Sequence, residues 1–246
     1  MEVYFYLKNF QIVPFGMLTQ SFRVAIIPFV IYNKNNIEGW LKNMENNKVI
    51  LSGTVSSQMI KSHESHGEIF YSFNISIERK SGTVDVIPVI VSQLILDCSK
   101  DFCGQRIVIY GQYRSYNKLT AEHTKLILSV FAEEITFPIE YVPEQNEIIL
   151  DGYICKKPIL RVSPFGRTIA DILLGVNRPC KKSDYIPLVI WGSVAKSAAM
   201  LNVGSRILIH GRIQSREYHS GTDSSKTAFE VSVMDMTVLK ECEKGN

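Results

Sequence analysis

The chain lacks long hydrophobic runs. None of its uncharged apolar stretches reaches the roughly 20 residues that a transmembrane helix needs, so we predict no membrane span. A strong excess of one charge is also missing, since the net charge of +3 is too small to argue for nucleic acid by itself. Hydrophobic residues make up 46% of the 246 residues and charged residues 21%, which excludes a disordered or collagen-like chain and allows one large or two small domains.

Motifs of catalysis and metal binding are scarce as well. The sequence has no nucleophile elbow, phosphate loop or metal triad, so we expect no enzyme and no cofactor. The five cysteines are odd in number and form no Cys-x-x-Cys, which favours a reduced, cytoplasmic protein. A zinc site drawn from His63, His66, Cys98 and Cys103 is the weaker interpretation, because the cysteine spacing is loose. A polar loop and two small core residues explain them better.

Residues 1–43 differ from the rest, with only six charged and nine aromatic side chains. They do not show the ordered charged, apolar and small-residue regions of a secretion signal. Two interpretations stay open. Met44 is the true first residue, since Glu38-Gly39-Trp40 can be encoded by a purine-rich string resembling a bacterial ribosome-binding site, or the segment adds a strand or helix to the first domain.

The sequence contains an internal repeat. Four blocks recur in the same order, at offsets of 99, 99, 100 and 101 residues. The matched pairs are 47–53 with 146–152, 85–89 with 184–188, 104–111 with 204–211, and 134–136 with 235–237. We therefore predict an atypical extension at 1–43 and two domains at 44–140 and 141–246.

The second copy predicts a small barrel. Its strands are expected at 147–154, 168–176, 185–191, 206–214 and 229–233, with one helix at 193–201. Three strands, a helix and a closing hairpin are the order of the oligonucleotide/oligosaccharide-binding (OB) barrel. The predicted fold is all-β, with two tandem five-stranded OB-fold barrels that each carry one short helix.

The second copy resembles the bacterial single-stranded DNA-binding protein family. The segments that carry the resemblance are 146–152, 175–179, 184–192 and 211–218. Together they span residues 146–239, and the first copy looks like a diverged member. The chain as a whole is similar to the tandem-barrel variety of this family, in which one polypeptide carries two barrels.

This resemblance implies base stacking on aromatic side chains. It places Trp191 and Tyr185 on the third strand as platforms, and Tyr218 in the following hairpin. A fourth aromatic position of the family falls on Cys180, so that platform is expected to be lost. The acidic C-terminal tail with which the family docks partner proteins is missing from the printed sequence. Because the family presents four barrels, the resemblance also implies a homodimer.

Charge separates the two copies. Residues 153–216 contain eleven basic and two acidic residues, whereas residues 44–140 contain nine basic and eleven acidic ones. A polyanion should therefore prefer the second copy. Trp191 and Tyr185 share one parity along their strand and should face the same way. The first copy has Ser92 and Val86 there, so we expect it to bind weakly or to serve assembly, although Tyr113 and Tyr116 remain candidates for stacking.

The predicted function is binding of single-stranded DNA without sequence preference, in replication, recombination and repair at the nucleoid in the cytoplasm. The predicted DNA-binding residues are Trp191, Tyr185, Tyr218, Arg178, Arg212, Arg216, Arg167, Lys181 and Lys182. The main alternative is an OB-fold accessory protein of replication restart or of a mobile element, which binds partner proteins and has little affinity for DNA. RNA binding is a third possibility, because this barrel also serves RNA-binding proteins.

Overall fold

The computed structural model describes residues 46–119, 124–163, 166–220 and 222–242, without the side chains of 124 and 217–226. The predicted extension 1–43, the proposed start at Met44 and the end of the chain beyond residue 242 lie outside the described residues. Residues 45–246 form one compact unit. The boundary predicted near residue 140 falls between two strands and stays a prediction.

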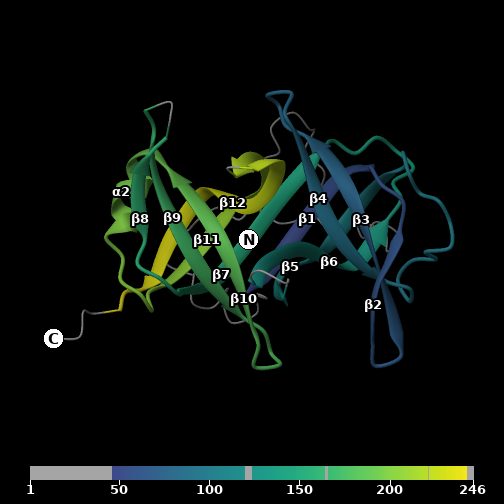
Figure 1. The fold of residues 1–246 in the computed structure, drawn as a ribbon, viewed down its shortest axis with the longest axis horizontal. Coiled ribbons are helices and arrows are strands. Elements are labelled where there is room, and N and C mark those ends of the chain that lie inside the picture. The colour runs from purple at the N-terminus through teal and green to yellow at the C-terminus, as the bar shows by residue number, and fades with distance from the viewer. Residues whose placement is uncertain (1–45, 120–123, 164–165, 221, 243–246) are drawn as a thin grey trace, which may run out of the picture. The chain divides into compact units, whose positions relative to one another are not determined.

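The described chain is built almost entirely of strands (Figure 1). The first barrel contains β1 (Asn47–Val55), β2 (Ile60–Ser65), β3 (Glu68–Glu78), β4 (Val84–Ser92), β5 (Arg106–Leu119) and β6 (Thr124–Thr136). The second contains β7 (Gln145–Ile154), β8 (Ile159–Val162), β9 (Thr168–Asn177), β10 (Ser183–Trp191), α2 (Gly192–Ala199), β11 (Arg206–Ser220) and β12 (Thr222–Lys240). The all-β fold with two tandem barrels is confirmed.

The barrels differ from the prediction in two details. Each has a sixth strand, β2 or β8, which pairs only with the strand that follows it and forms an edge of the sheet. The predicted helix is present in the second barrel, but in the first barrel the corresponding residues 93–101 form turns. No helix among the described residues is long and apolar enough to span a membrane.

Local hydrogen bonds explain why the first barrel has turns at this point. The Asp97 carboxylate accepts bonds from the Ser99 N–H and hydroxyl at 3.3 and 2.6 Å, and the Ser92 hydroxyl accepts one from the Leu94 N–H at 3.0 Å. Such side chains compete with helical backbone bonds. In the second barrel, Ala195 and Ala198 bury a small helical face instead.

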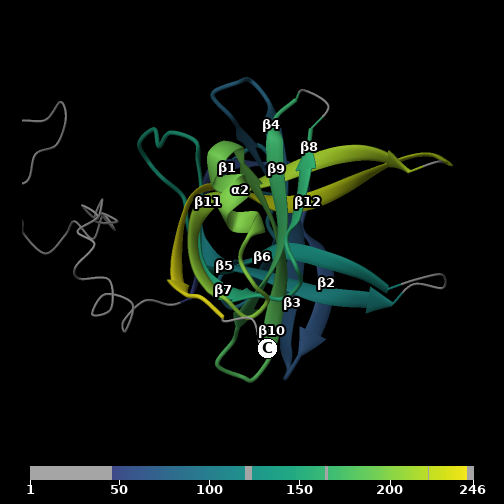
Figure 2. The ribbon, with the colours of Figure 1, turned by 90° about the vertical axis from the view of Figure 1, so that its left-hand side faces the viewer.

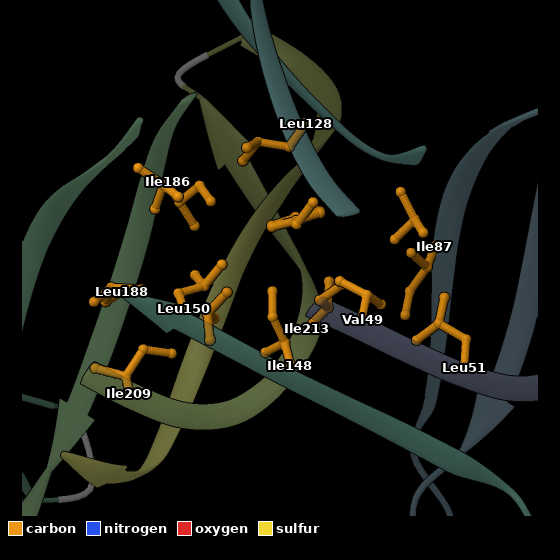
Figure 3. Close-up of a cluster of buried hydrophobic side chains, with 14 of the residues drawn as sticks. Val49, Leu51, Ile87, Leu128, Ile148, Leu150, Ile186, Leu188, Ile209 and Ile213 are labelled. Carbon is orange, nitrogen blue, oxygen red and sulfur yellow. The ribbon is translucent and has the colours of Figure 1, made fainter. Parts of the chain in front are cut away.

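Alternating apolar residues of the strands form the core. Val49 and Leu51 of β1 and Ile148 and Leu150 of β7 belong to one cluster of buried side chains (Figure 3). Gly211 sits at a bulge in β11, where a Cβ atom would lie 2.5 Å from the Ser232 carbonyl oxygen. A side chain at this position would prevent the close packing of β11 on β12.

The two barrels share one sheet. β1 and β7 pair in antiparallel register, with Val49 opposite Ile148, which joins the strands of both barrels edge to edge. Each strand carries an asparagine at or next to its first residue that ties its own barrel together: Asn47 exchanges two hydrogen bonds with the Tyr113 backbone, and Asn146 does the same with the Ile213 backbone. The first repeated block therefore contains the two strands that pair between the barrels, together with the asparagine that fixes each strand in its own barrel.

Candidate nucleic-acid interface

Strand β10 presents two aromatic rings on one face. Asp184, Ile186, Leu188 and Ile190 point inward and are buried, as the alternation of the strand predicts. Tyr185 and Trp191 have the opposite parity, and 43% and 37% of their respective surfaces are exposed. Neither ring is a core residue, so both are available to a flat ligand.

A third ring, missed in the sequence, lies beside them. Gly175 of β9 pairs with Tyr153 of β7 on one side and with Tyr185 of β10 on the other. Directly opposed residues of antiparallel strands point to the same face, so Tyr153 shares the face of Tyr185. Tyr153 is 41% exposed. Its odd position, in a strand where the even residues from Ile148 to Ile154 are buried, was the signal that could have identified it.

A groove of 440 Å³ runs across the same face. Pro187 and Val189, which lie between Tyr185 and Trp191 in β10, line it together with Leu173 of β9 and Ile159 of the edge strand β8. Its charged lining residues are Lys156, Lys157, Arg161, Asp171, Arg216 and Glu230. Four cations against two carboxylates leave the groove with a net charge of +2.

Two of these cations are paired. Arg161 holds Asp171 with two hydrogen bonds of 2.5 and 3.0 Å, and this bonding raises the pKa of the Arg161 guanidinium. Arg216 lies 3.7 Å from Glu230, which also accepts a bond from Gln214. The Arg216 guanidinium is mostly exposed, so this ion pair is weak and the cation can turn toward a ligand.

Three more of the predicted cations lie at the two ends of β9. Arg167 is exposed in the turn that leads into the strand, near the Trp191 end of β10, because Ile169 pairs with Trp191. Lys181 and Lys182 are exposed in the turn that follows β9, close to the Tyr185 end. The groove is therefore bracketed by positive charge along the direction of the strands.

Arg178 and Arg212 face the first barrel instead of the groove. Arg178 is bound twice by Asp184, through Nε at 2.7 Å and through Nη2, and it donates to the Ser115 carbonyl at 3.3 Å. Burial lowers the pKa of the Arg212 guanidinium, and nearby Arg79 of the first barrel lowers it further. Both residues belong to the contact between the barrels, which sequence alone did not reveal.

Tyr218 stands on β11, but its side chain lies outside the described residues. Lys156, Lys157 and Arg161 were counted in the basic stretch without being singled out. Their convergence depends on the short strand β8, which was not predicted. The long hairpins β5–β6 and β11–β12 extend away from the barrels (Figure 2).

In the first barrel, aromatic side chains cover part of the corresponding face. His63 stacks on Phe70 with 4.8 Å between ring centroids, Phe70 packs on Phe131 at 5.6 Å, and the Arg114 guanidinium lies 3.7 Å from the Phe131 centroid. Tyr113 is completely buried, so the expectation that it could stack on a base is wrong. Tyr116 is exposed.

The possible zinc ligands do not come together. His63 is occupied by its stack on Phe70. Across the described ranges, no group of three or more histidine, cysteine or acidic side chains is placed to hold a metal ion.

Comparisons with known proteins match the second barrel to one family. The Single-strand binding protein family matches residues 145–239. Single-stranded DNA-binding protein 3 of Listeria innocua is 31% identical over 107 residues, which are 41% of this chain and 67% of that protein. A protein of the same name from Clostridium acetobutylicum is 31% identical over 102 residues, 39% of this chain and 71% of that protein. None of these matches indicates an enzymatic family.

The fold of both barrels also has a solved counterpart. The crystal structure of the wild-type single-stranded DNA binding protein from Thermus aquaticus superposes with a TM-score of 0.62 and 22% identity, covering 81% of this chain and 96% of that one. The family predicted from the second copy is thus confirmed by sequence, and the tandem architecture by structure. The chain belongs to the single-strand binding protein family.

Proposed function

We propose that the second barrel binds single-stranded DNA without sequence preference, by stacking bases on Trp191, Tyr185 and Tyr153. One observation carries the proposal: exposed rings stand at both ends of the stretch of β10 that lines a groove, and the charged lining of this groove is mainly basic. Unpaired bases have two open faces, and every base can stack on an aromatic ring, which makes this mode of binding tolerant of sequence. The names of the relatives support the choice of ligand.

The spacing of the rings fits more than one nucleotide. Tyr185 and Trp191 are six residues apart in an extended strand, a separation of about 20 Å. The two rings therefore serve different bases. Phosphates between them would meet Lys156, Lys157 and Arg216, while Arg167 and the Lys181–Lys182 turn would hold the strand where it enters and leaves the groove.

The first barrel supports assembly under this proposal. Its equivalent face lacks both platforms and is partly covered by the stack of His63, Phe70, Phe131 and Arg114. Two chains would then form a homodimer with four barrels, of which two bind DNA. Such a protein would coat strands exposed during replication, recombination and repair at the nucleoid.

Titration of labelled oligo-dT tests the proposal. We expect binding at low salt, with the logarithm of the binding constant falling by about 0.7 for each phosphate contacted per tenfold increase in salt. Trp191→Ala should weaken binding by roughly 1–3 kcal/mol. Absence of binding at low salt, or full binding by Trp191→Ala, contradicts the proposal and leaves the partner-binding alternative. Competition with oligo-U distinguishes RNA from DNA.

A further inference from the structure

Two related joints connect the barrels away from the shared sheet. In one, the Ser115 N–H of the first barrel donates to buried Asp184 of the second at 2.6 Å, and Arg178 holds the same carboxylate. In the other, the Ser215 N–H of the second barrel donates to buried Asp85 of the first at 2.9 Å. Arg79 holds Asp85 as Arg178 holds Asp184. The serines are 100 positions apart and the aspartates 99, so the joints are repeats of each other.

Each serine also fixes the strand beyond the aspartate. The Ser115 hydroxyl accepts a hydrogen bond from the Tyr185 N–H at 2.8 Å. β9 pairs with β10 along one side, Tyr185 included, but on the other side β12 pairs only with Leu188 and Val189, so on that side the barrel provides no strand partner at Tyr185. The first barrel completes the edge of β10 at that residue.

The two joints differ in what they hold. The Ser215 hydroxyl accepts a bond from the Val86 N–H at 3.3 Å, in the same way as Ser115 does from Tyr185. Val86 is exposed but carries no ring, so this joint supports no stacking platform. The Ser115 joint, in contrast, supports one of the exposed aromatic platforms of the second barrel.

The surroundings of Tyr185 make this support important. Its ring lies over Gly175, which has no side chain, and Cε1 is 4.0 Å from the place where a Cβ would stand. Among the described residues the structure gives no hydrogen bond or ring contact to the Tyr185 side chain, so the position of the ring depends on the backbone of β10. Trp191, at the other end of the strand, is held by its own barrel, since its indole Nε1 donates to the Ser232 hydroxyl at 3.2 Å.

We propose that Ser115 of the first barrel is a positioning residue for the Tyr185 platform, so that the binding face of the second barrel is complete only when the first barrel is docked against it. This inference rests on the proposed function, because it assumes that Tyr185 stacks on a base. It gives the first barrel a part in DNA binding without any contact with DNA.

The matched variants Ser115→Ala and Ser215→Ala test it in the full chain. Each removes one hydroxyl from equivalent joints and leaves the backbone bond to the aspartate in place. We expect similar losses in the free energy of unfolding. Affinity for labelled oligo-dT should fall about fivefold in Ser115→Ala, the effect of one lost hydrogen bond, and should stay within twofold of wild type in Ser215→Ala.

A double-mutant cycle excludes a merely structural effect. In a Tyr185→Ala background, Ser115→Ala should cause no further loss of affinity, because the platform that it positions is gone. Equal affinities of Ser115→Ala and Ser215→Ala, or an undiminished effect in the Tyr185→Ala background, overturn the inference. Failure of the wild type to bind, or full binding by Tyr185→Ala, would instead refute the role of Tyr185 in the proposed function.

Discussion

At the scale of single residues, Trp191 combines an exposed ring with a fixed orientation. Its Nε1 is bound to Ser232, so one edge is anchored while the ring surface stays accessible. Trp191→Phe should keep most of the affinity for oligo-dT, because it retains a flat ring, whereas Trp191→Ala should lose roughly 1–3 kcal/mol.

Tyr141→Ala is the matched control for this pair of variants. Tyr141 is an exposed aromatic in the segment that connects β6 to β7, and it does not line the groove. Its removal should leave affinity unchanged. A loss in Tyr141→Ala as large as that in Trp191→Ala would show that exposed rings contribute in general and that β10 has no special role.

Tyr113 was a candidate for stacking on a base, but the structure places it in the core. Its hydroxyl is buried and has no hydrogen-bond partner among the described atoms. Since a buried, unpaired hydroxyl costs free energy, Tyr113→Phe should raise the free energy of unfolding by about 1 kcal/mol, measured in urea. A lower free energy of unfolding in the variant would mean that the hydroxyl is satisfied.

The pH dependence of Tyr113 gives a second check. Burial raises the pKa of the phenol above its ordinary value, with a smaller contribution from Glu230. The folded state therefore keeps the proton at a pH where the unfolded state has lost it. Stability is unaffected below about pH 10, where the unfolded phenol titrates, and falls above it. Tyr113→Phe should remove this part of the alkaline loss.

At the scale of elements, the loop between β7 and β8 brings two lysines to the groove. Lys156 and Lys157 line it without carboxylate partners given by the structure, in contrast to Arg161. Replacing both by alanine should reduce the steepness of the salt dependence of oligo-dT binding by about 1.4, if each contacts one phosphate.

Two exposed lysines of the first barrel supply the control. Lys61→Ala/Lys100→Ala removes the same charge from surface ion pairs of the barrel that we expect not to bind. The salt dependence should then be unchanged. Equal slopes for the two double variants would indicate a general electrostatic attraction with no contacts in the groove.

Strand alternation explains which elements could be predicted from sequence. The parity of Tyr185 and Trp191 and the buried set of β10 follow from a period of two. The edge strand β8 has four residues, too few to show such a period, so the convergence of Arg161 and Lys156 on the groove was not foreseen. In the first barrel, the local bonds of Asp97 and Ser92 outweighed the helix that the repeat suggested.

At the scale of the whole molecule, matched positions of the repeat lie at the contact between the two barrels. Asp85 and Asp184 are matched positions in the sequence, and each is buried between an arginine of its own barrel and a serine of the other. That Arg178 faces the first barrel could not be predicted from sequence, because the sequence of one repeat unit does not show which surface of the other unit packs on it.

These joints predict equal effects at equivalent positions. Removal of one partner from a buried ion pair leaves an unpaired charge, so Asp184→Ala and Asp85→Ala should each lower the free energy of unfolding by about 3–5 kcal/mol. Urea denaturation measures both. A loss below about 1 kcal/mol in either variant would show that the joint does not stabilise the fold.

We expect the bases of single-stranded DNA to lie on the face of the second barrel that carries the three exposed rings. Photo-crosslinking with an oligo-dT that carries 5-iodouracil, followed by mass spectrometry of the attached peptides, tests it most directly. We expect crosslinks at Trp191, Tyr185 and Tyr153. Crosslinks confined to the first barrel, with those three residues unmodified, would contradict it.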